Sequence, residues 1–233
     1  MAIVEAEGLW KKFIAGDIEV EAIRGIGFSI VPASFVSFIG PSGSGKSTLL
    51  NMIGCLDPPT SGRLLVAGQD VTRLGTRDAA AFRGTHIGFI FQDFNLLPVL
   101  TVFENIEYPL LMVQNWPVAE RRARVEKMLA AVGMSDQGHK FPHQISGGQK
   151  QRVAVARALV TRAELVLADE PTANLDRDTA QRIITLMKTM RDEFGTTFIF
   201  STHDSKIVSN AEVVFTLEDG RLAASHHSGE AHA

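Results

Sequence analysis

Residues 35–53 read FVSFIGPSGSGKSTLLNMI, and this stretch decides the fold. An apolar run, FVSFI, is followed by GPSGSGKS at 40–47, which fits G-x-x-x-x-G-K-[ST] at every fixed position, and the helical run TLLNMI comes next. A strand, a glycine-rich loop and a helix in this order form a phosphate cradle, because the glycines let the loop turn its backbone N–H groups inward. The residues expected to hold phosphate are Gly40, Pro41, Ser42, Gly43, Ser44, Gly45, Lys46, Ser47 and Thr48.

Three further apolar runs resemble the strand before this loop: HIGFIFQ at 86–92, LVLAD at 165–169 and TTFIFSTHD at 196–204. Near-continuous runs of β-branched and aromatic residues are typical of strands buried on both faces, as in a parallel sheet covered by helices. The sequence therefore predicts an α/β fold.

Other parts of the chain have different patterns. The first 30 residues and SGRLLVAGQDV at 61–71 alternate between apolar and polar residues and are interrupted by Gly and Asp, which favours an antiparallel β subdomain beside the main sheet. Between Gln92 and Leu165 the strand pattern is replaced by helical periodicity. We therefore expect a helical subdomain, inserted over residues 94–158.

The run LVLADE at 165–170 ends in two carboxylates, at the edge where parallel sheets bind ligands. Asp169 is suited to hold Mg²⁺, directly or through water, together with the Ser47 hydroxyl. Glu170 is suited to orient an attacking water or accept a proton from it. A solvated acidic turn is the alternative, and the phosphate loop elsewhere in the chain argues against it. Lys46 is expected to reach the outer phosphates.

Two more polar residues end predicted strands on the same edge. Gln92 ends HIGFIFQ, and its amide can contact the metal or the attacking water, or cap a turn. His203 follows the run TTFIFST, and a lone histidine in this position also suits a structural role. Both alternatives stay open on these residues alone.

A second anion site is predicted at ISGGQKQR, residues 145–152, ahead of the helical run VAVARALV. Ser146 can cap the helix, while Gly147 and Gly148 let a ligand approach the backbone N–H groups at its N-terminus. Gln149 completes the group of candidate contacts. One chain would thus carry two phosphate-binding features.

Composition limits the remaining classes of protein. The 233 residues are 45% hydrophobic, which suffices for one large domain or a domain with an insertion. Lys and Arg number 23 against 26 Asp and Glu, so the net charge of -3 does not favour nucleic acid as a partner. The single cysteine and the lack of a leader pattern or a long apolar run favour the cytoplasm. A domain over residues 1–222 and a mobile tail over 223–233 are expected.

Taken in order, GPSGSGKS, Gln92, ISGGQ, LVLADE, ANLD at 173–176 and His203 resemble the motif set of an ATP-binding cassette (ABC) ATPase. The resemblance covers nearly the whole chain and implies a RecA-like P-loop NTPase core, with ATP and Mg²⁺ as ligands. It also implies a homodimer in which two cassettes pack head to tail. The signature residues Ser146, Gly147, Gly148 and Gln149 would then contact the partner's nucleotide. Asp176 would couple the two sites, and His203 would sense the terminal phosphate.

Two positions depart from the usual family pattern. The family usually has Tyr where Phe13 stands, and Phe13 can still stack on adenine, because stacking needs only a π-face. Burial of Phe13 beneath the first strands is the alternative. The signature begins with Ile145 in place of the usual Leu, which changes little.

The segment FQDFNLLPVLTVFENIEYPLLM, starting at residue 91, resembles the ATPase subunits of lipoprotein-releasing and macrolide- or peptide-exporting systems. That resemblance implies integral membrane transporter subunits as partners and a peripheral position on the cytoplasmic face of the inner membrane. The apolar residues suit a groove for a partner helix, and they also suit the core of the helical subdomain. The cargo is not readable from the sequence.

Two other classes of function are alternatives to a transporter motor. A soluble ABC-type ATPase acting on ribosomes or chromosomes usually has two cassettes or a long coiled-coil insertion, and this chain has one cassette and a short interval between Gln92 and Ser146. A non-hydrolysing regulatory binder would lack catalytic groups, whereas Lys46, Glu170 and His203 are all present. The sequence therefore favours the motor subunit of a transporter.

Overall fold

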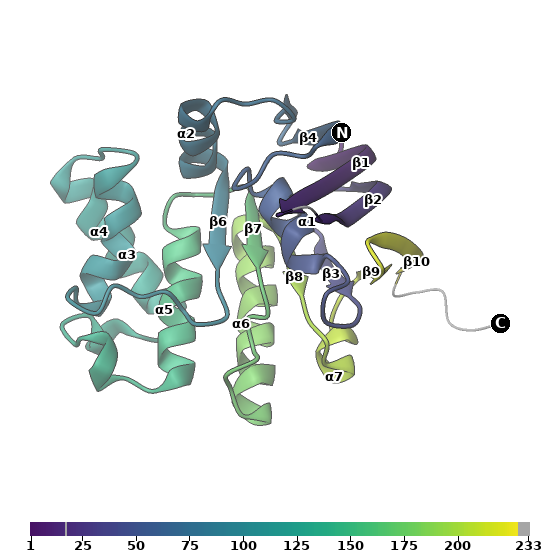
Figure 1. Ribbon diagram of the computed structural model, residues 1–233. Coiled ribbons are helices and arrows are strands. Elements are labelled where there is room, and N and C mark those ends of the chain that lie inside the picture. The colour runs from purple at the N-terminus through teal and green to yellow at the C-terminus, as the bar shows by residue number, and fades with distance from the viewer. Residues whose placement is uncertain (17, 228–233) are drawn as a thin grey trace.

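The larger of two sheets carries the phosphate loop. The computed structural model describes residues 1–16 and 18–227. The six strands follow the order β10-β9-β3-β8-β7-β6 (Figure 1). Pairs from β9 to β6 are parallel, and β10 pairs antiparallel with β9. Their bounds are β3 Phe35–Ile39, β6 Ile87–Ile90, β7 Leu165–Ala168, β8 Thr197–Ser201, β9 Val213–Glu218 and β10 Arg221–His227.

The smaller sheet is antiparallel, as the alternating patterns near the N-terminus predicted. Its four strands follow the order β2-β1-β4-β5. The strands are β1 Val4–Ala15, β2 Ile18–Ile30, β4 Ser61–Val66 and β5 Gln69–Asp70. In Figure 1 the long strands β1 and β2 lie on the opposite side of the molecule from α3 and α4. The expected α/β fold with an antiparallel subdomain is confirmed.

Helices cover the larger sheet and fill the interval between β6 and β7, where Figure 1 shows α3, α4 and α5. The α-helices are α1 Lys46–Ile53, α2 Thr76–His86, α3 Val102–Met112, α4 Val118–Ala131, α5 Gly147–Leu159, α6 Arg177–Phe194 and α7 Ser205–Val208. Two short 3₁₀ helices, η1 Ser135–Gln137 and η2 Pro142–Gln144, join α4 to α5. Within the described ranges, no helix has the length and hydropathy needed to cross a bilayer.

Alternate residues of the central strands enter two different hydrophobic clusters. Phe198 and Phe200 pack with α5 and α6, whereas Ile199 packs with α1 and the antiparallel sheet. Because successive side chains of a strand point to opposite faces, this division shows that the sheet is buried on both sides. The near-continuous apolar runs of the sequence follow from it.

Helix α1 lies between the two sheets. Its residues Leu49, Met52 and Ile53 are at most 1% exposed and share a cluster with Ile26 of β2 and Leu64 of β4. Complete burial of one such side chain contributes about 1.5–3 kcal/mol. The helix that begins at Lys46 is therefore anchored by the packing of both sheets.

One part of the expected tail is wrong. Residues 223–227 belong to β10, where Ala224 is the Cα partner of Thr216, and Ser225 is that of Phe215. Backbone hydrogen bonds to β9 order this segment although its polar side chains suggest a solvated tail. The remaining part of the expected tail, 228–233, lies outside the described residues.

Candidate nucleotide site

The phosphate loop connects β3 to α1 in a conformation that requires glycine. Gly45 has φ of 102°, and a Cβ on it would lie 2.6 Å from the carbonyl oxygen of Ala22. This φ is in the left-handed region that L-residues rarely adopt, and the neighbouring backbone leaves no room for a side chain. The loop is therefore held close to β2, the strand that contains Ala22.

Lys46 follows directly and is 8% exposed. Its ammonium donates hydrogen bonds to the carbonyl oxygens of Gly40, at 2.8 Å, and Pro41, at 2.9 Å. These bonds satisfy the buried charge within the loop itself. They place a cation at the point where the motif predicts the outer phosphates.

A pair of oxygen atoms beside the loop fits a magnesium ion. The Ser47 hydroxyl donates to Asp169 Oδ1 over 3.1 Å, so side chains from α1 and from the end of β7 meet. Hydroxyl and carboxylate oxygens are the hard ligands that Mg²⁺ prefers. The two residues predicted as ligands are thus adjacent, although they are far apart in sequence.

Ser201 at the end of β8 holds both carboxylate-bearing residues. Its hydroxyl donates to Asp169 Oδ1 over 2.6 Å and accepts from the backbone N–H of Glu170 over 2.9 Å. Ser201 is fully buried. The motifs described above do not include Ser201, and its signal in the sequence is a serine at the end of an apolar run, two positions before His203.

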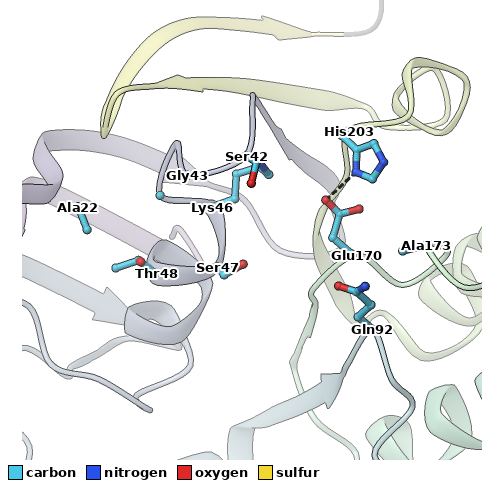
Figure 2. Close-up of a pocket in the computed structure, with 11 residues that line it drawn as sticks. Ala22, Ser42, Gly43, Lys46, Ser47, Thr48, Gln92, Glu170, Ala173 and His203 are labelled. Carbon is cyan, nitrogen blue, oxygen red and sulfur yellow. Dashed lines mark hydrogen bonds and ion pairs between the residues drawn. The ribbon is translucent and has the colours of Figure 1, made fainter.

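Glu170 and His203 contact each other inside the pocket of Figure 2, where a dashed line joins their side chains. His203 Nδ1 lies 3.0 Å from Glu170 Oε1. The Glu170 backbone has φ of 47°, a left-handed value that costs a non-glycine residue about 1–2 kcal/mol. Such strain is concentrated at functional sites when surrounding contacts maintain it, and the bond to Ser201 is one such contact.

Gln92 comes from the chain just after β6 and lies on the Glu170 side of the pocket (Figure 2). Its side chain is exposed. The Asn174 amide donates to the Gln92 carbonyl oxygen over 3.1 Å and to Asp93 Oδ1 over 2.9 Å. These bonds connect the segment after β6 to the turn between β7 and α6.

Lys46, Ser47, Gln92, Glu170 and His203 line one cavity of about 650 Å³. Figure 2 shows Lys46 and Ser47 facing Glu170 and His203 across it. The complete lining is Ala22, Ser42, Gly43, Gly45, Lys46, Ser47, Thr48, Gln92, Glu170, Ala173 and His203. A cation, hydroxyl groups and a glycine-rich backbone on one side, opposite a carboxylate on the other, suit a phosphorylated ligand and its chemistry.

Phe13 is outside this lining. It lies on β1, it is 41% exposed, and its Cα partner on β2 is Val20. Val20 is two residues from Ala22, which does line the cavity. The alternative of a buried Phe13 is therefore wrong, and the ring is accessible beside the cavity.

The signature residues line a separate cavity of about 500 Å³. Ser146 is the N-cap of α5 and forms a capping box with Gln149: Gln149 N donates to Ser146 Oγ over 3.3 Å, and Ser146 N donates to Gln149 Oε1 over 2.9 Å. Gly147, Gly148 and Asp176 line the same cavity. Asp176 caps α6, and hydrogen bonds from Thr179 lower the pKa of its carboxyl group, so it carries negative charge at neutral pH.

The two cavities share no lining residue. Both nevertheless suit an anion such as phosphate, because a glycine-rich loop with Lys46 lines the first and a helix N-terminus lines the second. The sequence profile described as ABC transporter matches residues 23–173. This chain belongs to the ABC transporter family.

Relatives of this ABC protein include single-domain and larger proteins. An uncharacterized ABC transporter ATP-binding protein of Thermotoga maritima is 43% identical over 97% of this chain and 96% of its own length. The lipoprotein-releasing system ATP-binding protein LolD 1 of Caulobacter vibrioides is 42% identical over 96% of this chain and 95% of its own. The macrolide export protein MacB of Hyphomonas neptunium is 41% identical over 99% of this chain, which spans only 36% of that protein.

Solved structures agree with this assignment. The dimeric ATP-binding cassette MJ0796, in a post-hydrolysis state bound to ADP and Pi, has a TM-score of 0.87 and 37% identity, and the match covers 96% of this chain and 98% of that one. The protein cbiO1 of Clostridium perfringens, described as part of the ABC transporter complex cbiONQ, has a TM-score of 0.88 at 30% identity, and the match covers 97% of this chain and 88% of that one. This ABC protein therefore has the RecA-like P-loop fold of the ATP-binding cassettes.

Proposed function

We propose that this chain hydrolyses ATP to ADP and phosphate as the motor subunit of a transporter. The observation that carries the proposal is the cavity in which Glu170 and His203 face Lys46 and the phosphate loop. Phosphoryl transfer requires little covalent work from the protein and depends on positioning and charge stabilisation. A cradle on one side and a carboxylate on the other supply both.

Each side chain of the cavity has a separate task in this proposal. The phosphate loop and Lys46 bind the triphosphate, and the exposed ring of Phe13 stacks on adenine. Glu170 Oε1 orients the attacking water and accepts its proton, and His203, which contacts that carboxylate, holds it in place and faces the terminal phosphate. Ser47, Asp169 and Gln92 would hold Mg²⁺, which neutralises phosphate charge when bound.

We further propose that the working form is a head-to-tail homodimer. Ser146 and the N-terminus of α5 line a cavity of their own, separate from the cradle of the same chain. A helix N-terminus with exposed N–H groups suits an anion, and the γ-phosphate held by a second chain is such an anion. Gly147, Gly148 and Gln149 would contact that nucleotide, and Asp176 would couple the two sites.

Membrane subunits are the proposed partners, with the chain bound peripherally at the cytoplasmic face of the inner membrane. The support is a set of exposed apolar side chains before, on and directly after α3, near a further cavity of about 240 Å³ that Pro109 and Val113 help to line. An exposed patch of this kind suits a partner helix. The proposed cargo is a lipoprotein, or a hydrophobic compound or peptide, and relatives named for lipoprotein release and for macrolide export support a cargo of this kind. The exposed set is Leu97, Val99, Tyr108, Leu111, Met112 and Val113.

The catalytic proposal is tested with Glu170→Gln. This change keeps the size of the side chain and removes the proton acceptor, so turnover should fall by about 10²-fold or more while ATP still binds. Phosphate release and nucleotide affinity are measured on the same preparations. Hydrolysis within about threefold of the unmodified chain would remove Glu170 from the role, since a general base contributes more than that.

The dimer is tested by mixing two damaged chains. Lys46→Ala and Ser146→Arg chains are each expected to be inactive alone. In a head-to-tail pair, the mixture contains one doubly damaged site and one intact site, so some hydrolysis should return. If both residues serve a site within one chain, every site stays damaged. ATP-dependent dimerisation is measured alongside, and absence of both signals would contradict the shared site.

A further inference from the structure

Lys11 is a buried lysine two positions before Phe13 on β1. Its side chain is 10% exposed, and its ammonium contacts the Asp57 carboxylate and donates to the Pro58 carbonyl oxygen over 2.8 Å. The same nitrogen lies 5.0 Å from the centroid of the Phe13 ring. Residues i and i+2 of a strand point to the same face, so the ammonium and the ring lie side by side on one face of β1.

The partners of Lys11 belong to the loop that follows α1. The N–H groups of Leu56 and Asp57 both donate to the Asn51 carbonyl oxygen on α1, over 2.9 and 3.3 Å. Residue 60 at the end of this loop is bonded to β1: Thr60 N donates to the Trp10 carbonyl oxygen over 2.8 Å. The loop is thus attached both to the helix of the phosphate cradle and to the strand of Phe13.

We propose that Lys11 is a positioning residue for the nucleotide base. Its ammonium lies over one face of the Phe13 ring, which leaves the opposite face for the base, and its bonds to Asp57 and Pro58 fix that ring relative to the cradle. This inference rests on the proposed binding of ATP and on stacking of its adenine on Phe13. A cation near a ring is attracted to the π-face, so the contact restrains the ring itself as well as its strand.

The geometry favours a role of Lys11 in positioning over a role in stability alone. A buried ion pair is weak evidence for stability, because desolvation of both charges offsets their attraction. Lys12, the next residue, is more exposed and pairs with Glu19 and Glu21 on the neighbouring strand. The register of β1 and β2 shifts between Lys11 and Lys12 because Ala22 of β2 is left unpaired, and Ala22 lines the cavity.

The test compares ATP with inorganic tripolyphosphate, which has no base, both with Mg²⁺. Dissociation constants are measured for Lys11→Met, Phe13→Ala and the double variant. Lys11→Met should weaken ATP by about fivefold and leave tripolyphosphate within about twofold, because only the base contact is affected. Phe13→Ala should weaken ATP by about tenfold, as expected for loss of a stacking contact. The double variant should be no weaker than Phe13→Ala alone.

Lys12→Met is the matched control, and its ratio of ATP to tripolyphosphate affinity should be unchanged. Equal weakening of both ligands by Lys11→Met, or an effect that adds fully to Phe13→Ala, would overturn the proposal. If Phe13→Ala leaves the ratio unchanged, the stacking itself is refuted, whereas failure of the Lys11 variant alone refutes only this inference. Should Lys11→Met not fold, Asp57→Asn removes the anionic anchor and is judged by the same ratio.

Discussion

Ser201→Ala is the most direct probe of how the fold holds Asp169 and Glu170 at the edge of the sheet. The change removes one oxygen atom from a fully buried position. That oxygen donates to Asp169 Oδ1 over 2.6 Å and accepts from Glu170 N over 2.9 Å. Asp169 then loses a short hydrogen bond, and the strained backbone at Glu170 loses its anchor.

The expected cost follows from these two bonds. A hydrogen bond to a charged group contributes about 1.5–3 kcal/mol, and a buried N–H left without a partner costs about 1–3 kcal/mol. Asp169 and Glu170 are only half-buried, so water replaces part of what is lost. We therefore expect the free energy of unfolding to fall by about 2 kcal/mol. Turnover should fall by about tenfold, because small misplacement of a catalytic group is costly.

Ser37→Ala is a matched control in the neighbouring strand. Ser37 on β3 is also fully buried, and its Cα partner on β8 is Phe200, next to Ser201. Its hydroxyl has no hydrogen-bond partner among the described residues. The same substitution should therefore leave the free energy of unfolding within about 0.5 kcal/mol or raise it, since no bond is lost.

Urea unfolding of the three proteins, followed by fluorescence of the two tryptophans, gives the differences at a common slope. Phosphate release gives turnover. Equal stability of the two variants would refute the assigned strength of the Ser201 bonds. A clear loss of stability in Ser201→Ala with unchanged turnover would refute its role in placing Glu170.

Three further predictions concern other parts of the chain. Burial raises the pKa of the Cys55 thiol to about 11, so its alkylation by iodoacetamide at pH 8 should be about a hundredfold slower than that of a thiol of pKa 9.0. The rate should increase as the pH rises, and a rate at pH 8 equal to that of the reference thiol would contradict the raised pKa. Gly88→Ala places a Cβ 2.2 Å from the Ala158 carbonyl oxygen and should cost about 3 kcal/mol in urea unfolding, whereas Gly75→Ala, with its nearest atom at 4.0 Å, should cost less than about 1. Leu97→Glu, at a position 39% exposed, should abolish co-purification with the proposed membrane subunit and retain basal hydrolysis; loss of folding would assign Leu97 to the core.

The sequence predicted those parts of the site that depend on local order along the chain. The phosphate loop needs a strand, glycines and a helix in succession, and the sequence between Phe35 and Ile53 predicts all three. Asp169 and His203 were placed on one edge because parallel strands bring their carboxyl ends together. The structure adds the distances, with Ser47 3.1 Å from Asp169, and His203 3.0 Å from Glu170.

Contacts that depend on how distant segments pack were not predictable. Ser201 looked like one more residue of a buried run, and only the pairing of β7 with β8 brings its hydroxyl to Asp169. The burial of Lys11 depends on the loop after α1, whose Asp57 carboxylate contacts its ammonium, and the local pattern around Lys11 and Lys12 does not indicate this contact. The error at 223–227 has the same origin, because pairing with β9 orders a segment that has no apolar pattern of its own.

The position of α1 between the two sheets has a practical consequence. Helix α1 packs in the core that both sheets share, so unfolding of the molecule also destroys a binding site at the N-terminus of this helix. A compound bound there therefore raises the free energy of unfolding of the whole chain. At a concentration about 100 times its dissociation constant, such a compound adds about 2.7 kcal/mol to the free energy of unfolding. Thermal-shift screening can therefore rank nucleotide analogues on the purified chain without a transport assay.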